Sequence, residues 1–454
     1  MTTTALPPTA LRGRLLSFLA APKGAGDAAS YRYIPDGVVV VEAGRIARVG
    51  PAAEVLPALP AGTAVDHYPD ELILPGFIDA HLHFPQTQVI ASYGAQLLDW
   101  LQKYTFVAEQ RYADQAYAER QAKWFLGELL ANGTTTAAVY GSVHPGSAEA
   151  FFAESERLGT AMIAGKVMMD RNAPSGLLDT AQSSYDDSRA LLERWHGKGR
   201  QRYAVTPRFA ITSTEAQLEA AGALAREFPD AYVQTHIAEN LKEVAAVREL
   251  FPDSRDYLDV YDTYGLLGPK TLFGHCIHLE ERERRRMAET GSVAVFCPTS
   301  NLFIGSGLFP LRVLQGRELA RRDPPVRIAA ATDVGGGTSY SMLRTLGEGY
   351  KVQQLQGTNL SALEAFHLVT AGNAEALGLQ HEIGTIAPGR CADLVVLDAR
   401  ATAAMAHRME AVEADLEEEL FILMTLGDDR SVKATYIQGR RMHEREGTRS
   451  RSPA

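Results

Sequence analysis

The sequence predicts an α/β protein in which a (β/α)8 TIM-type barrel carries a small β-sandwich domain built from both ends of the chain. Between about residues 74 and 380, short aliphatic or β-branched runs alternate with helical stretches, a pattern typical of repeated βα units around a parallel sheet. Two strand-rich stretches, at 38–49 and at 392–398 with 432–438 after it, flank this region. Although these runs are far apart in sequence, we expect them to pair into one small domain.

Eight candidate strands occur within the central region. They cover residues 77–83, 134–140, 161–167, 204–209, 232–236, 271–275, 293–296 and 327–332. Eight βα units in about 300 residues suit a (β/α)8 barrel with insertions, in which the chemistry lies at the carboxyl ends of the strands. We therefore expect a catalytic barrel over 74–383 and a discontinuous small domain over 1–73 and 384–454.

Composition and charge exclude several classes of protein. The formal net charge of −10 argues against binding to a nucleic-acid backbone, which requires a basic surface. No apolar run approaches the length of a membrane span, and the apolar patch at 15–21 is too short and lacks the cleavage segment of a signal peptide. Three scattered cysteines fit a reducing cytosol and supply neither a disulfide framework nor a cysteine-based zinc site. We expect a cytoplasmic protein that binds neither nucleic acid nor a membrane.

The first candidate strand ends in the segment LPGFIDAHLH at 74–83. Side chains two residues apart on a strand point to the same face, so His81 and His83 can both face one ion at the mouth of the barrel. A pair of histidines at this spacing also occurs by chance. Its place at the end of the first barrel strand is what favours a metal site.

Three later strands also end in residues of the metal-ligand type. His236 ends the fifth candidate strand, His275 ends the sixth, and Asp333 follows the eighth. Each of them alone could be a buried structural residue, but with the histidine pair they place five ligand-type side chains at one end of the barrel. This set, together with GTIAPGRCADL at 384–394, resembles the amidohydrolase superfamily of metal-dependent barrel enzymes.

The resemblance covers nearly the whole chain and implies a metal centre. In the mononuclear deaminases of the superfamily, the metal is bound by residues at the positions of His81, His83, His236 and Asp333. The residue at the position of His275 contacts the activated water or the substrate. Imidazole nitrogens and one carboxylate suit Zn²⁺ and would accept Fe²⁺. Binuclear relatives use a modified lysine at the end of the fourth strand, whereas Lys166 falls in the third candidate strand, so we expect one zinc ion per subunit.

Glu239 follows His236 by three residues and lies just past the strand end. A carboxylate there can move a proton between an activated water and a ring nitrogen of the substrate, which is worth roughly 10²–10⁴-fold in rate. The alternative is an N-cap or first-turn glutamate that stabilises a helix dipole. The His-x-x-Glu element of the superfamily's deaminases favours the catalytic role, with His275 and Asp333 orienting and stabilising the adduct.

Finer motifs resemble one branch of the superfamily, the guanine deaminases. They are HFPQTQ at 83–88, YG at 93–94, LLDWL at 97–101, TPRF at 206–209 and CPTSN at 297–301. The resemblance implies that Gln86, Arg208 and Phe209 contact the base, since an arginine fork suits the O6 and N7 acceptors of guanine and an aromatic ring can stack on a purine. Without the resemblance, we would interpret Arg208 as a partner in an ion pair and Phe209 as a residue of the hydrophobic core. The resemblance implies hydrolytic deamination of guanine to xanthine and ammonia by a homodimer.

Two other functions stay open at this point. Small changes in the pocket would shift the preference to another amino-heterocycle, such as 8-oxoguanine, a pterin or a triazine. A catalytically inactive barrel would serve as a scaffold, but we expect such a protein to have lost ligand residues, and all of them are present here. A different zinc deaminase fold is excluded, because its H-x-E half matches 278–280 while its P-C-x-x-C half is missing.

Overall fold

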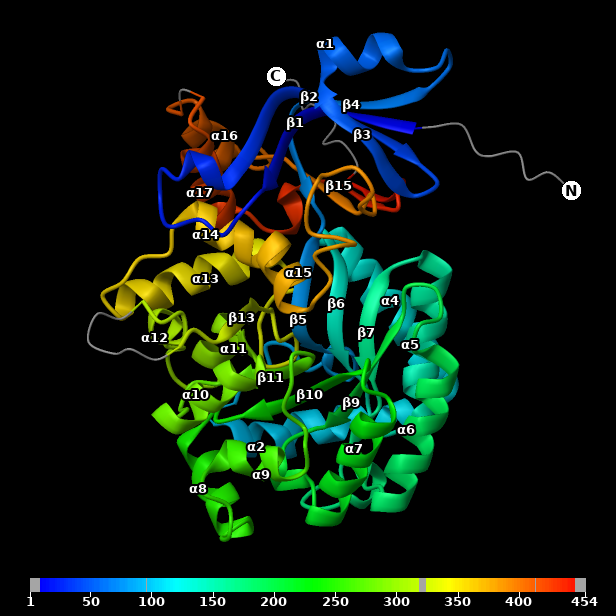
Figure 1. Ribbon diagram of the computed structural model, residues 1–454, viewed down its shortest axis with the longest axis vertical. Helices are drawn as coiled ribbons and strands as arrows, with labels where there is room; N and C mark the ends of the chain where they lie inside the picture. Colours follow the sequence, from blue (N-terminus) through cyan, green and yellow to red (C-terminus); the bar gives the residue numbers. More distant parts are fainter. Residues whose placement is uncertain (1–8, 95, 318–323, 413, 446–454) are drawn as a thin grey trace, which may run out of the picture.

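The computed structural model describes residues 9–94, 96–317, 324–412 and 414–445. The strands in these ranges form two sheets, a barrel in the lower part of Figure 1 and a seven-stranded sheet above it. The predicted fold class, a (β/α)8 barrel with an additional β layer from both chain ends, is confirmed. Within the described ranges, helices long and apolar enough to cross a membrane are absent.

Parallel strands form the barrel in the order in which they occur along the chain. They are β5 (Phe77–His83), β6 (Thr134–Tyr140), β7 (Ala161–Gly165), β9 (Arg202–Pro207), β10 (Tyr232–Ile237), β11 (Thr271–His275), β12 (Val293–Phe296) and β13 (Arg327–Ala330), with the short β8 (Val167–Met168) paired to β9. Strands β5, β6, β11 and β12 have the predicted bounds, and the others differ by one or two residues at an end. The aliphatic runs therefore located all eight strands of the barrel.

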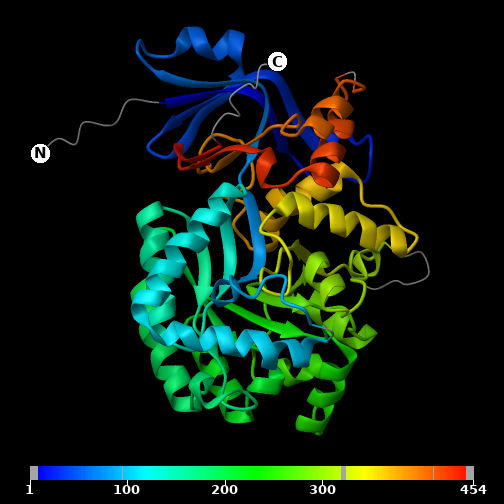
Figure 2. The same ribbon diagram turned by 180° about the vertical axis from the view of Figure 1, so that it is seen from behind.

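Helices cover the outside of the barrel. They are α4 (Gln115–Ala131), α5 (Pro145–Leu158), α6 (Ala181–Trp195), α7 (Glu215–Glu227), α8 (Leu241–Leu250), α9 (Tyr257–Thr263), α10 (Glu281–Thr290), α11 (Pro298–Phe303), α12 (Leu311–Leu314), α13 (Met342–Leu355), α14 (Ala362–His367) and α15 (Asn373–Ala376). Seen from behind, the cyan and teal helices that follow β5 and β6 lie outside their strands (Figure 2). Asp114, Thr180 and Thr214 begin α4, α6 and α7 as N-cap residues whose side chains accept backbone N–H groups of the first turn.

The connection from β5 to α4 is made of short helical pieces. These are a 3-10 turn (Phe84–Gln86), α2 (Leu97–Trp100), a π-helical turn (Leu101–Thr105), α3 (Phe106–Glu109) and a second 3-10 turn (Gln110–Ala113). Single π-helical turns within helices occur frequently at functional sites. This segment follows directly after the predicted histidine pair, so it lies at the mouth of the barrel.

The first and last strands of the barrel meet at their carboxyl ends through backbone hydrogen bonds. The Asp333 N–H donates to the His81 carbonyl at 2.9 Å, and the His83 N–H donates to the Val334 carbonyl at 3.1 Å. These bonds place residues that are about 250 positions apart in sequence next to each other. The predicted ligands on the first and last strands are therefore neighbours.

Further from the carboxyl ends of β5 and β13, the side chain of Asn373 bonds to both strands in place of direct backbone hydrogen bonds between them. Its Nδ2 donates to the carbonyls of Ile78 at 2.6 Å and Ala330 at 2.8 Å, and its Oδ1 accepts the Ala330 N–H at 2.8 Å. The residue is fully buried at the start of α15. One amide group thus joins β5 to β13 where the two strands do not bond directly.

The second sheet joins the two ends of the chain, as predicted. Its strands, in spatial order, are β16 (Arg440–Glu444), β15 (Val432–Ile437), β14 (Leu394–Leu397), β4 (Ala64–Pro75), β1 (Thr9–Phe18), β2 (Tyr31–Glu42) and β3 (Arg45–Pro51). All seven are hydrogen-bonded in one continuous sheet, with one apolar cluster along β1, β2, β4, β14 and β15. Helix α1 (Ala52–Val55) follows β3 in the chain. Helices α16 (Ala403–Met409) and α17 (Leu416–Leu426) lie between β14 and β15 in the sequence, where we did not predict helices.

Candidate active site

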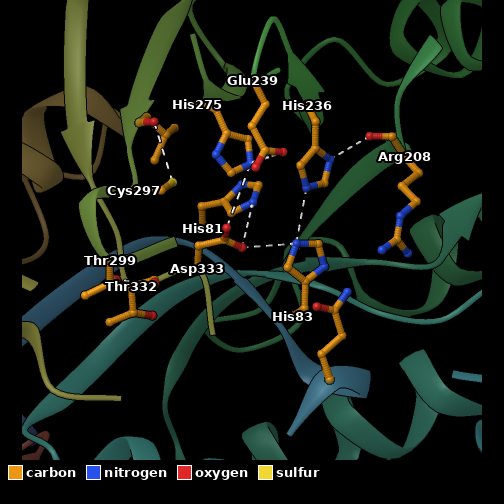
Figure 3. Close-up of polar contacts among 12 residues, drawn as sticks. His81, His83, Arg208, His236, Glu239, His275, Cys297, Thr299, Thr332 and Asp333 are labelled. Atoms are coloured by element: carbon orange, nitrogen blue, oxygen red, sulfur yellow. Dashed lines mark hydrogen bonds and ion pairs between the residues drawn. The ribbon is translucent and has the colours of Figure 1, made fainter. Parts of the chain in front are cut away.

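Four histidines and one aspartate meet at the carboxyl end of the barrel. Figure 3 shows the imidazoles of His81, His83, His236 and His275 around the carboxylate of Asp333. Ligand atoms of His81, His83 and His236 lie within 4.8 Å of one another, and the same holds for His81, His275 and Asp333. All five side chains are buried. The structure therefore brings together the five residues that the sequence analysis selected at the strand ends.

The Asp333 carboxylate lies at the centre of this group. Its Oδ1 is 3.4 Å from Nε2 of His81 and 3.3 Å from Nε2 of His83, and its Oδ2 is 3.8 Å from Nε2 of His275. His83 Nε2 and His236 Nε2 are 3.2 Å apart. Nitrogen lone pairs and a carboxylate that converge at these distances could hold a metal ion.

Backbone conformation helps to aim two of these side chains. His275 has φ of 73° and Asp333 has φ of 50°, both in the left-handed region that side chains other than glycine rarely adopt. Such conformations cost on the order of 1–3 kcal/mol each and are concentrated at functional sites. Each strand thus turns sharply at its last residue or just past it.

Electrostatics keep the group in the form that binds metals. Burial lowers the pKa of the His81 imidazole and lowers the pKa of His83 to about 3. Burial, reinforced by the neighbouring imidazoles, holds the pKa of His236 well below its usual value. Burial opposes ionisation of Asp333, but its contacts with His81, His83 and His275 hold the pKa of its carboxyl well below the usual value. Neutral imidazoles and an ionised carboxylate are the ligand forms of a zinc-type centre.

Glu239 faces the same space from the loop after β10. Its Oε1 accepts from Ser306 Oγ at 2.8 Å, and its Oε2 lies 3.3 Å from Nε2 of His275. Burial, together with the negative charge of Asp333, raises the pKa of Glu239 to about 8. The alternative role as a helix cap belongs instead to Asn240, which forms a capping box with Glu243 at the start of α8. The Glu239 carboxylate is therefore directed at the cavity.

A cavity opens over the cluster. His83, His236, Glu239, His275 and Asp333 form its floor, and all three residues expected to contact a base, Gln86, Arg208 and Phe209, line it. Its apolar lining comes from Leu97, Trp100, Leu101 and Ile304. An apolar lining with a few convergent polar groups is typical of pockets that bind small molecules.

A buried carboxylate that no sequence motif indicated contacts both Gln86 and Arg208. Both oxygens of Glu109 are 2.9 Å from Nη1 of Arg208, and Oε1 also accepts from Gln86 Nε2 at 2.9 Å. Arg208 thus is an ion-pair partner as well as a cavity residue. Glu109 lies outside all of the sequence motifs, so no pattern in the sequence indicated that it belongs to the site. Asn301, which holds Nδ1 of His275 at 2.9 Å, lies within the CPTSN motif.

Other candidate metal ligands lie outside the group. Lys166, between β7 and β8, is ion-paired with Asp179 and donates to the Val167 carbonyl at 3.3 Å. His278, the histidine of the H-x-E match, is 2.9 Å from the Ser306 carbonyl through Nε2. The groups of His, Cys, Asp and Glu residues that could hold a metal, within the described ranges, do not contain His278.

Residues 72–442 match the amidohydrolase family. The guanine deaminase of Escherichia coli (strain K12) is 48% identical over 418 residues, which cover 92% of this chain and 93% of that protein. The crystal structure of guanine deaminase from Bradyrhizobium japonicum shares 39% identity at a TM-score of 0.92, over 97% of this chain and 100% of that chain. The structure of guanine deaminase from C. acetobutylicum with bound guanine in the active site shares 27% identity at a TM-score of 0.83, over 96% of this chain and 99% of that chain.

Proposed function

Since this chain belongs to the amidohydrolase family, we propose that it deaminates guanine by hydrolysis, giving xanthine and ammonia. The observation that carries the proposal is the cavity itself. A cluster of metal-ligand type and the Glu239 carboxylate form its floor, while Arg208, Gln86 and Phe209 form a wall that suits a flat, polar base. The similarity to guanine deaminases over nearly the full chain supports the choice of guanine among amino-heterocycles.

We propose that one zinc ion is held by His81, His83, His236 and Asp333. Neutral imidazoles and a carboxylate, all buried and directed at one point, fit a borderline-soft divalent ion. The buried Nε2 of His81 has no hydrogen-bond partner among the described residues, as a ligand nitrogen would require. Zinc would supply Lewis-acid activation, which lowers the pKa of a bound water to about 7. Iron would fit the same ligands, so metal analysis of the purified protein decides between them.

The protein's own residues then arrange the substrate and move the proton. Arg208 donates to the carbonyl oxygen of the base, and Phe209 supports its ring face. Glu239 lies where it can take a proton from the attacking water and deliver it to the ring nitrogen beside C2. His275, oriented by Asn301, contacts the attacking water, and with Asp333 it stabilises the adduct. A C2–O bond forms, the second proton of the water passes to the amino group, the C2–N bond to that group breaks, and ammonia leaves.

A panel of substrates tests this proposal. Purified protein of known metal content is incubated with guanine, 8-oxoguanine, a pterin and an aminotriazine, and ammonia release is measured for each. We expect the highest kcat/KM for guanine, with xanthine as the product. A higher kcat/KM for a pterin or a triazine would reassign the substrate, and absence of turnover with any of them by metal-loaded protein would contradict an enzymatic role.

Two further parts of the proposal concern the whole protein. We propose a homodimer and a cytoplasmic location, which rest on the family resemblance and on the scattered cysteines. Light scattering of the purified protein measures the first, and fractionation of cells that produce it measures the second.

A further inference from the structure

A buried carboxylate holds both polar side chains of the cavity wall. Glu109, on α3, is fully buried, and Arg208 is 3% exposed. The Arg208 Nη1 donates to both oxygens of Glu109 at 2.9 Å, and the Gln86 Nε2 donates to Oε1 at 2.9 Å. The Arg208 guanidinium also lies 5.5 Å from the centre of the Phe106 ring, one helical turn before Glu109. These contacts fix the orientation of both side chains.

The contact with Glu109 decides which end of the Gln86 amide is free. A carboxylate only accepts hydrogen bonds, so the NH₂ group of Gln86 must face it and the carbonyl oxygen must point away. That oxygen lies against Gly335, where a Cβ atom would be 2.0 Å from it, and Gly335 has φ of 125°. A glycine is therefore required for the amide to pack there. The free oxygen accepts no hydrogen bond from the described residues.

Arg208 can offer only hydrogen-bond donors to a ligand. One guanidinium nitrogen is used by Glu109, and the other N–H groups of a guanidinium can donate but cannot accept. The wall of the cavity thus offers donors from Arg208 and an acceptor from Gln86. A ligand edge that fits it carries a carbonyl oxygen next to a ring N–H.

We infer that Glu109 is a positioning residue that makes the enzyme selective for oxo-purines over amino-purines. This inference rests on the proposed function. Guanine carries the O6 acceptor beside the N1–H donor, which is the pattern that the wall complements. The base 2,6-diaminopurine keeps the reacting 2-amino group but reverses both features, with a 6-amino donor beside an N1 acceptor. A site built to hydrogen-bond one pattern rejects the other because its own buried groups would be left unpaired.

The variant Glu109→Gln tests the inference. The new amide would keep its oxygen on Arg208 and turn its NH₂ toward Gln86, which must then rotate and present its own NH₂ to the cavity. We expect the ratio of kcat/KM for guanine to that for 2,6-diaminopurine to fall by at least about tenfold. Metal content should stay close to that of the wild type, while the melting temperature should fall because the buried Arg208 loses its counter-charge. The exposed Glu119, replaced by Gln, is the matched control and should leave the ratio unchanged.

The double variant Q86E/E109Q exchanges the two groups. Its carboxylate at position 86 would accept from the amide at position 109 and again present an acceptor oxygen to the cavity, so the guanine preference should return toward the wild-type ratio. If Glu109 only neutralises the buried Arg208, E109Q would lower kcat/KM for both substrates by the same factor. That result, or a double variant that fails to recover the ratio, would overturn the inference.

The outcome also separates this inference from the proposed function. A wild-type protein without turnover of guanine would overturn both, whereas turnover with an unchanged ratio in E109Q would overturn only the assignment of Glu109. If E109Q does not fold, Gln86→Leu removes the acceptor and leaves the pair of Glu109 and Arg208 intact. The ratio must then fall as well, and an unchanged ratio in Q86L would contradict the inference.

Discussion

The Nε2 atoms of His83 and His236 lie 3.2 Å apart, and the His83 Nε2 is also 3.3 Å from Oδ1 of Asp333. The Nδ1 of His236 is 2.7 Å from the carbonyl oxygen of Arg208, and a carbonyl only accepts, so that nitrogen carries the proton and Nε2 is left with its lone pair. Burial lowers the pKa of His83 to about 3 and lowers the pKa of His236 well below its usual value, so both rings stay neutral at pH 7. The buried lone pair of His236, held this close to the His83 imidazole that contacts Asp333, favours a cation within the group.

Removal of the metal should therefore destabilise the protein as well as inactivate it. A ligand that binds only the folded state stabilises it by about 2.7 kcal/mol at a hundredfold excess over its Kd. We expect dialysis against a chelator to lower the melting temperature by a few degrees and to abolish deamination, and zinc to restore both. Circular dichroism melts at each step, with metal content measured in parallel, check this. An unchanged melting curve in demonstrably metal-free protein would contradict a buried metal centre.

The variant Glu239→Gln should lose activity and keep its fold. The amide can still accept from Ser306 Oγ, but it cannot take or return a proton. We expect kcat to fall by roughly 10²–10⁴-fold, with metal content and melting temperature unchanged. Steady-state kinetics on guanine measure the loss. A metal-loaded variant that turns over guanine at nearly the wild-type rate would remove the proton-transfer role from Glu239.

The amide of Asn373 should contribute strongly to the free energy of unfolding, because it makes three hydrogen bonds to buried backbone groups. Replacement by Ala would leave two carbonyls and one N–H unpaired in the buried seam between β5 and β13. Unpaired buried groups cost about 1–3 kcal/mol each, so we expect the variant to lose about 3 kcal/mol or more of unfolding free energy. Urea unfolding measures this, with the exposed Asn359→Ala as the control. Equal stabilities of the two variants would show that the seam holds without Asn373.

The sequence was enough to locate the barrel strands and the ligands at their ends. Periodicity identifies a strand whether or not its partners are known, and His81 and His83 follow directly from alternation along β5. The directions of the His275 and Asp333 side chains could not be predicted, because both residues have a positive φ that is uncommon for residues other than glycine. Such conformations are imposed by surrounding contacts and are absent from local sequence preferences.

Contacts between distant segments were also beyond the sequence. Glu109 pairs with a residue 99 positions later, and nothing in its neighbourhood distinguishes it from a solvent-exposed glutamate. The two chain ends were expected to form a small β-sandwich, and hydrogen bonding in the structure joins their strands into one continuous sheet. Helices α16 and α17, between β14 and β15, were not predicted. Pairing partners depend on the assembled fold, so a single sequence cannot specify them.

Acid should destabilise the protein through His367, which is buried and packs edge-on against Phe18 with ring centres 5.5 Å apart. Burial lowers the pKa of His367 from 6.5 to about 4, although the charge of Glu364 opposes this. Between these values the unfolded chain binds a proton that the folded protein does not, so this residue should reduce the unfolding free energy by about 1.4 kcal/mol per pH unit as the pH falls. Its Nε2 has no hydrogen-bond partner among the described residues, so His367→Phe should keep the ring packing and lose that part of the slope. Urea unfolding of both proteins from pH 7 to 4.5 measures the difference, and parallel slopes would contradict a buried neutral His367.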